Sequence, residues 1–120
     1  MDCKDLMVGD LVYIHEPECK GHRIDSIDEL DGQVGADGEV YDECDIRPIP
    51  LTEGILVKNG WRKESITIDG DYCKYTLPGF ALNWCDTDGF WYQNGDITPN
   101  HVHTLQHLLR LCGIEKEIEL

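Results

Sequence analysis

The chain has 120 residues, 41% of them hydrophobic, and a formal net charge of −14. This apolar content suits one domain or two small subdomains with a real core, and it excludes a disordered chain. The acidity argues against direct binding of DNA or RNA, because phosphate contacts need lysine and arginine, and no apolar run is long enough to span a membrane.

The first half of the chain predicts short strands separated by tight turns. Asp31-Gly32 and Asp37-Gly38 are strong turn signals, and Pro48 and Pro50 end the run because proline cannot donate to a strand ladder. We expect strands at 11–14, 23–27, 33–35, 39–41 and 45–49. Five short strands in about fifty residues predict a small β-barrel over residues 1–51.

A short helical joint is predicted at 52–60. Thr52 suits the N-cap of a helix over residues 53–59, and Gly60 suits its C-terminal stop. Residues 61–120 then form the second predicted subdomain. Eight of the ten aromatic residues fall in 61–92, where strands are expected at 65–68, 72–77, 80–84 and 90–93. The Gly-containing turns between these strands predict an antiparallel meander.

The last element is an amphipathic helix, predicted from Pro99 to Cys112 with Thr98 as its N-cap. Its apolar stripe recurs at helical spacing through Leu105 and Leu109, and Gly113 fits a left-handed stop. We expect this helix to lie on the aromatic face of the meander, and residues 115–120 to add an edge strand. The predicted fold class is therefore α+β.

Two resemblances accompany this pattern. The opening Leu6-x-x-Gly9-Asp10-x-Val12 resembles the start of an SH3-like barrel over residues 6–50. The segments 49–61 and 102–115 resemble a group of short uncharacterised bacterial proteins often found near prophage or mobile-element genes. This second resemblance implies a phage-derived accessory protein in a bacterial cytoplasm. It supplies no activity and no site residue.

The N-terminus has neither the basic nor the apolar region of a signal peptide, which also predicts a cytoplasmic location. The six cysteines are then expected as reduced thiols. His15, Cys19 and His22 have residue types that suit zinc, with Cys44 or Cys3 as further ligands. Because no Cys-x-x-Cys pair accompanies them, we expect a polar loop there, with no metal and no cofactor.

Three features are candidate binding surfaces. His103, His107 and Arg110 share one side of the last helix, where we expect a solvated polar face rather than a two-histidine metal site. Trp91 is expected to face away from Phe90, either as a partner or sugar anchor or as a cover for the joint. The third is an acidic surface made by Asp25, Asp28, Glu29, Asp31, Asp42, Glu43 and Asp45.

No catalytic motif is present. The two serines, Ser26 and Ser65, lie in no Gly-x-Ser-x-Gly sequence, and no glycine-rich phosphate loop occurs. We therefore predict a non-enzymatic interaction protein with a protein partner. The alternatives are an acidic nucleic-acid mimic that inhibits a basic protein, which requires the acids to form one array, and a metal-dependent enzyme.

Overall fold

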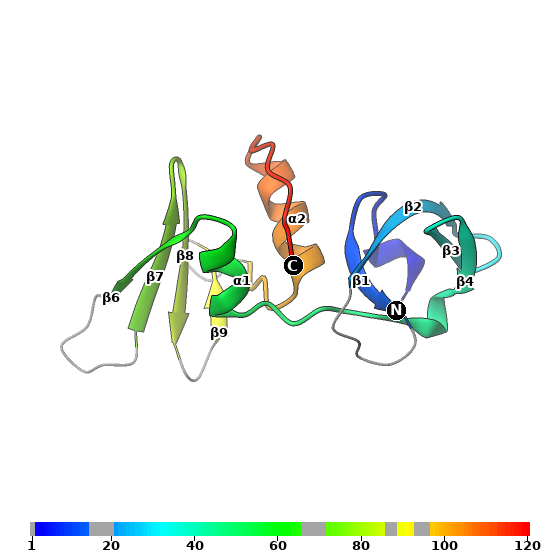
Figure 1. The fold of residues 1–120 in the computed structure, drawn as a ribbon, viewed down its shortest axis with the longest axis horizontal. Coiled ribbons are helices and arrows are strands. Elements are labelled where there is room, and N and C mark those ends of the chain that lie inside the picture. Colours follow the sequence, from blue (N-terminus) through cyan, green and yellow to red (C-terminus); the bar gives the residue numbers. More distant parts are fainter. Residues whose placement is uncertain (1, 15–20, 66–71, 86–88, 93–96) are drawn as a thin grey trace. The chain divides into compact units, whose positions relative to one another are not determined.

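The computed structural model describes residues 2–14, 21–65, 72–85, 89–92 and 97–120, and for Ser65 and Tyr72 the backbone alone. The chain forms two compact units. Unit 1 contains Met1–Pro50 and His101–Glu115, and unit 2 contains Leu51–Asn100 and Lys116–Leu120. Each unit combines an antiparallel sheet with one α-helix (Figure 1), so the predicted α+β class is confirmed.

Unit 1 is built on a five-stranded antiparallel sheet with the order β4-β3-β2-β1-β5. Its strands are β1 (Leu11–Ile14), β2 (His22–Asp28), β3 (Gln33–Ala36), β4 (Glu39–Asp42) and β5 (Ile46–Arg47). The 3-10 helix η1 (Cys3–Asp5) precedes the sheet, and η2 (Glu43–Asp45) joins β4 to β5. All five predicted strands are present. In the part of the chain that the structure describes, β4 and β5 are edge strands, so the hydrogen-bonded sheet is open rather than a closed barrel.

Strand alternation divides unit 1 into an inner and an outer side. On β3, Val34 and Ala36 are fully buried, while Gln33 is exposed. The buried cluster contains Cys3, Leu6, Val12, Ile14, Ile24, Val34, Ala36 and Ile46. The register of β2 against β3 shifts between Ile24 and Ser26, and a β-carbon at Gly35 would lie 2.1 Å from the Ser26 Oγ. This bulge therefore requires glycine at position 35.

Helix α2 (Val102–Leu111) starts later than predicted. The backbone N–H of Val102 donates to the Ile49 carbonyl at 2.8 Å, and His101 forms a bridge with Pro50, so the residues before Val102 are extended. The predicted start at Pro99 with a Thr98 cap is therefore wrong. The predicted stop is confirmed: Gly113 has φ 73°, and the N–H groups of Gly113 and Ile114 donate to Arg110 and Leu109 in a Schellman arrangement.

The helix also belongs to a different part of the chain from the one predicted. It is grouped with unit 1, where it contacts β1, whereas the sequence pattern placed it with the meander. The first segment of unit 1 ends at Pro50, next to the predicted end of the first subdomain at residue 51, whereas the predicted second subdomain, 61–120, is divided between the two units. Leu105 and Leu109 on the predicted apolar stripe are fully buried, and so is Val102.

Unit 2 is the predicted meander with a short helix. Its sheet has the order β6-β7-β8-β9, with β6 (Arg62–Ser65), β7 (Tyr72–Leu77), β8 (Phe80–Cys85) and β9 (Gly89–Trp91) all antiparallel. Helix α1 (Glu53–Lys58) is capped as predicted, because the Ile55 N–H donates to Thr52 Oγ1 at 3.3 Å. β6 begins three residues earlier than expected, and most of its predicted range lies outside the described residues. The predicted edge strand at 115–120 does not form.

The core of unit 2 is aromatic. Leu82 and Leu56 are fully buried, and Tyr75, Phe90 and Trp61 are nearly so. Trp61 meets Phe80 edge to face at 6.3 Å between ring centroids. None of the helices among the described residues is long and apolar enough to cross a membrane.

Candidate functional site

The turn from Met7 to Asp10 introduces β1 and is built around a buried carboxylate. Gly9 has φ 95°, a conformation that favours glycine, and the Asp10 N–H donates to the Met7 carbonyl at 3.1 Å. Asp10 is fully buried, and its Oδ2 accepts a hydrogen bond from the Met7 N–H at 2.8 Å. The side chain thus closes the same turn that its backbone forms.

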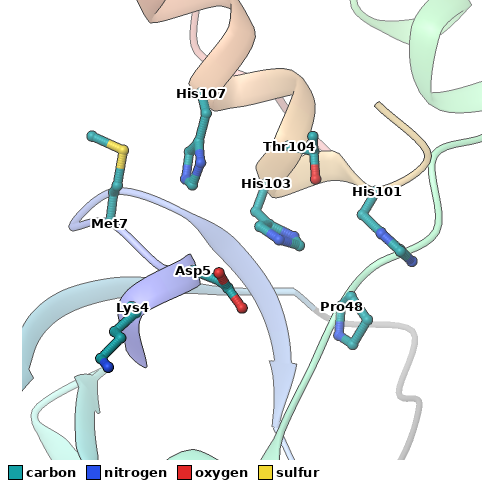
Figure 2. Close-up of a pocket in the computed structure, with 8 residues that line it drawn as sticks. All are labelled: Lys4, Asp5, Met7, Pro48, His101, His103, Thr104 and His107. Carbon is teal, nitrogen blue, oxygen red and sulfur yellow. The ribbon is translucent and has the colours of Figure 1, made fainter. Parts of the chain in front are cut away.

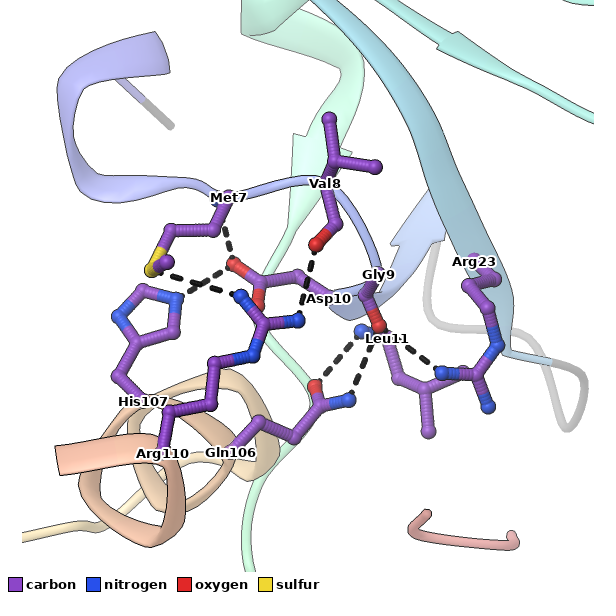
Figure 3. Close-up of polar contacts among 9 residues, drawn as sticks. All are labelled: Met7, Val8, Gly9, Asp10, Leu11, Arg23, Gln106, His107 and Arg110. Carbon is purple, nitrogen blue, oxygen red and sulfur yellow. Dashed lines mark hydrogen bonds and ion pairs between the residues drawn. The ribbon is translucent and has the colours of Figure 1, made fainter. Parts of the chain in front are cut away.

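Helix α2 holds this turn through polar side chains (Figure 3). Gln106 accepts from the Leu11 N–H at 2.8 Å and donates to the Gly9 carbonyl at 3.0 Å. Arg110 donates to the Val8 carbonyl at 2.9 Å. The polar side of α2 is therefore packed against unit 1, and the predicted solvated face is wrong for this stretch. Sequence analysis missed Gln106 because its partners lie 95 and 97 residues away.

His107 bonds to the buried carboxylate. Its Nε2 lies 2.7 Å from Asp10 Oδ2, while Asp10 Oδ1 has no hydrogen-bond partner among the described residues. A histidine oriented by a buried carboxylate is one half of a general-base arrangement. The site also has a hollow of about 530 Å³ beside it, lined by Lys4, Asp5, Met7, Pro48, His101, His103, Thr104 and His107 (Figure 2).

Three imidazoles line this hollow, those of His103 and His107 on α2 and that of His101 at its N-cap (Figure 2). The ring centroid of His103 lies 5.8 Å from that of His101 and 5.7 Å from that of His107. His103 is only 7% exposed, and its Nδ1 is buried with no partner in the described part of the chain. Burial lowers the pKa of His103, with the neighbouring imidazoles acting in the same direction and Asp10 against it. His103 is therefore held neutral.

These contacts give the histidines a structural role. His107 is engaged by Asp10, and its ring stands at 79° to that of His103. Within the described residues, no group of three histidine, cysteine or acidic side chains is placed to hold a metal ion. Among the described residues that line the hollow, Thr104 supplies the hydroxyl and none carries a thiol. What the arrangement does is to tie α2 to the Met7–Asp10 turn.

The loop whose residue types suit zinc lies mostly outside the described residues, so the expectation of a polar loop without metal stays a prediction. His22 lies in β2, where its Nδ1 is 2.5 Å from Asp37 Oδ2. His15 and Cys19 lie outside the described residues. Of the two further ligands that were considered, Cys3 is buried in the core of unit 1 and Cys44 is exposed in η2.

Several acidic residues lie on the outer side of the sheet formed by β2, β3 and β4, and others lie in the turn and in the 3-10 helix beside it. Gln33 pairs with Asp28 on one side and with Asp42 on the other, so the two carboxylates share the outer face at the same end of the sheet. Asp25 reaches the same face, since its Oδ1 would lie 2.9 Å from a β-carbon at Gly35. We define the acidic face by these strands, the β2–β3 turn and η2. Its acids are Asp25, Asp28, Glu29, Asp31, Asp42, Glu43 and Asp45.

Local hydrogen bonds shape this face but do not neutralise it. Asp28 Oδ1 accepts from the N–H groups of Leu30 and Asp31, and Glu43 Oε2 accepts from the Cys3 N–H, which lowers the pKa of Glu43. Among the described residues, no lysine or arginine forms an ion pair with Asp28, Asp31 or Asp42.

Two exposed apolar side chains belong to the same face, and sequence analysis missed them. Leu30 in the β2–β3 turn is 98% exposed, and Val40 on β4 is 66% exposed. Val40 pairs with Gly35, which places it on the outer side between the acids. The alternation of β4 is the signal that would have placed Val40 there, had its register been known.

Trp91 lies on the other unit, at the end of β9. It pairs with Asn83, whereas the buried Phe90 pairs with Trp84, so the two aromatic side chains take opposite faces, as expected. Across the sheet, Asn83 pairs in turn with Lys74, and Lys74 pairs with Glu64, so these residues form one cross-strand row with Trp91. Trp91 is half-buried.

Comparisons of the chain with models of protein families, with curated proteins and with solved structures find no match. No relative therefore supplies a substrate, a partner or a site residue for this chain.

Proposed function

We propose that this protein is a non-enzymatic interaction protein whose acidic face binds a basic surface of another protein. The observation that carries the proposal is the strand register, which sets Asp28 and Asp42 on either side of Gln33 with the turn acids beside them. Unit 1 has 15 acids against 5 bases, a net charge of −10, so the face lies within a strongly negative unit.

The spacing of the carboxylates supports a shared partner. Neighbouring strands are about 4.8 Å apart, so side chains two strands apart are separated by roughly 10 Å. This is about one Debye length at physiological salt, so the charges act together on an approaching cation. Such a field accelerates association with a basic protein and repels acidic ones. It contributes nothing to the fold, where like charges repel.

The exposed apolar side chains favour a protein as the partner. Specific interfaces combine an apolar centre with a polar rim, and Val40 has that position among the acids of the face. Leu30 offers a second apolar contact at the turn. A purely electrostatic attraction would not require either residue.

A narrower form of the proposal is that the basic partner is a nucleic-acid-binding protein and that the acidic face takes the place of phosphates. The placement of Asp28 and Asp42 on either side of Gln33 supports this mimicry, which requires the acids to form one array. The SH3-like barrel that residues 6–50 resemble is part of this proposal, although the hydrogen-bonded sheet of unit 1 is open in the described part of the chain. A prophage-associated accessory protein of a bacterial cytoplasm would fit this role.

The test is a charge reversal with a matched control. The variant Asp28→Lys/Asp42→Lys changes the face, and Glu115→Lys/Glu117→Lys changes two exposed acids elsewhere by the same net charge. Binding of fluorescein-labelled decalysine, measured by anisotropy at low salt, should weaken at least about tenfold more in the first variant than in the second. Equal weakening in both variants would contradict the proposal.

The narrower form has its own readout. Proteins retained by the immobilised wild-type chain from a bacterial lysate should include nucleic-acid-binding proteins, and a 20-base-pair DNA duplex should displace them. Basic proteins that duplex DNA fails to displace would support the interaction role and reject the mimicry.

A further inference from the structure

The C-terminal segment Lys116–Leu120 lies in unit 2 as an extended chain without strand pairing. Its side chains alternate in exposure. Ile118 is 1% exposed, whereas Glu117 and Glu119 on either side of it are exposed. The segment therefore has one apolar anchor in the core of unit 2 and acidic flanks in solvent. This is the pattern of a bound extended peptide.

The backbone of the segment is recognised by one amide side chain. Asn59 Nδ2 donates to the Glu119 carbonyl at 2.7 Å, and Asn59 Oδ1 accepts from the Glu119 N–H at 2.7 Å. Asn59 is 7% exposed, and its Nδ2 also donates to the Ile55 carbonyl at 2.8 Å at the end of α1, which fixes the orientation of the amide. A bidentate amide of this kind recognises a peptide backbone whatever side chain the residue carries.

Two further contacts flank the anchor. Lys58 Nζ donates to the Leu120 carbonyl, and Lys116 Nζ lies 5.8 Å from the ring centroid of Trp61. A cation at this distance is attracted by the ring face. Lys58, Asn59 and Trp61 thus contact the segment on both sides of Ile118, and we call these three residues, with the site of Ile118, the tail groove.

We infer that the tail groove is a peptide-binding site whose built-in occupant is the C-terminal segment. The partner it fits is an extended segment with a β-branched or leucine anchor, a lysine or arginine two residues before the anchor, and free choice at the following residue. The partner's cation would take the place of Lys116 over Trp61, and its backbone would take the two hydrogen bonds of Asn59. This site is separate from the acidic face and does not depend on it.

The tether controls access to the site. A short covalent connection gives the segment an effective concentration in the millimolar range, so a free peptide competes poorly while the segment is bound. Release of Ile118 exposes the groove. The groove therefore opens only when a partner or a local fluctuation removes the segment.

The test uses the peptide acetyl-Lys-Glu-Ile-Glu-Leu-amide, labelled with fluorescein, and full-length protein. The variant Ile118→Ser weakens the built-in occupant and leaves the groove intact, so it should bind the peptide at least about tenfold more tightly than the wild-type chain does. Adding Asn59→Leu, which is close in size, should abolish this binding, and a peptide with serine in place of isoleucine should not bind. A folded Ile118→Ser protein that ignores the peptide, or binds it independently of Asn59, would overturn the inference.

A second measurement covers the case in which Ile118→Ser fails to fold. In the wild-type chain, amide exchange at Glu119 should occur by local opening, faster than exchange at the central strands β7 and β8. Peptide at a concentration above the effective concentration of the tethered segment should raise the exchange rate of Glu119 and leave the rates of β7 and β8 unchanged. Exchange of Glu119 only through global unfolding, or a rate that the peptide leaves unaltered, would show that the segment is a fixed part of the fold.

Discussion

Replacing Gln106 tests the attachment of α2 to the Met7–Asp10 turn. The variant Gln106→Met keeps the length and helix propensity of the side chain but removes both hydrogen bonds to the turn. The Leu11 N–H is then buried without a partner, which costs about 1–3 kcal/mol. The Gly9 carbonyl keeps its hydrogen bond from Arg23, so losing the bond from Gln106 adds only about 0.5–1 kcal/mol.

The expected loss of unfolding free energy is therefore about 1.5–4 kcal/mol. It is measured by urea denaturation followed by circular dichroism, with amide exchange of Leu11 as a local readout. The control is Leu111→Met on the same helix, which is 80% exposed and should change the free energy by less than about 0.5 kcal/mol. A Gln106→Met protein as stable as the control, with an unchanged exchange rate at Leu11, would refute the proposed attachment.

Three further predictions follow from burial. Leu105→Ala removes a fully buried side chain and should lower the unfolding free energy by about 2–5 kcal/mol in the same assay; near wild-type stability would contradict its packing. Because the pKa of His103 is lowered from its usual 6.5, the unfolded chain binds the proton more readily than the folded chain does. The contribution of His103 to stability should therefore be full above pH 6.5 and fall as the pH drops below it. The variant His103→Leu should reduce that fall, and a pH profile identical to that of the wild type would argue against a neutral buried imidazole. Burial raises the pKa of the Cys3 thiol to about 11, so iodoacetamide at pH 8 should modify the exposed Cys44 well before Cys3. Peptide mass spectrometry measures the two rates, and equal rates would be inconsistent with the buried thiol.

Local sequence signals located most elements of this fold. The strands Leu11–Ile14 and Tyr72–Leu77 have the predicted bounds. Thr52 caps the start of α1 and Gly113 stops α2, both as expected. These features depend on residues within a few positions of one another, through alternation, capping oxygens or a positive φ. The grouping of acids in residues 25–45 was visible for the same reason.

The candidate sites were only partly visible in the sequence. His103 and His107 were recognised as neighbours on a helix face, but the burial of His103 and the bond from His107 to the buried Asp10 were not. The acids were recognised, but the exposed Leu30 and Val40 among them were not, since their place depends on the register of β3 and β4. A pairing register is set by both strands and their turn, and neither strand alone specifies it.

The sequence by itself determined the composition of each strand and helix, their order, and the acidic character of the first half. Tertiary structure alone decided which of these elements join. The bond between Ile49 and Val102 delays the start of α2, the contacts of Gln106 attach that helix to unit 1, and Asn59 holds Glu119 from 60 residues away. Each of these is a hydrogen bond between groups that are distant in the chain and at least partly buried once they meet. Their pairing depends on the positions of both partners in the folded chain, which no local pattern encodes.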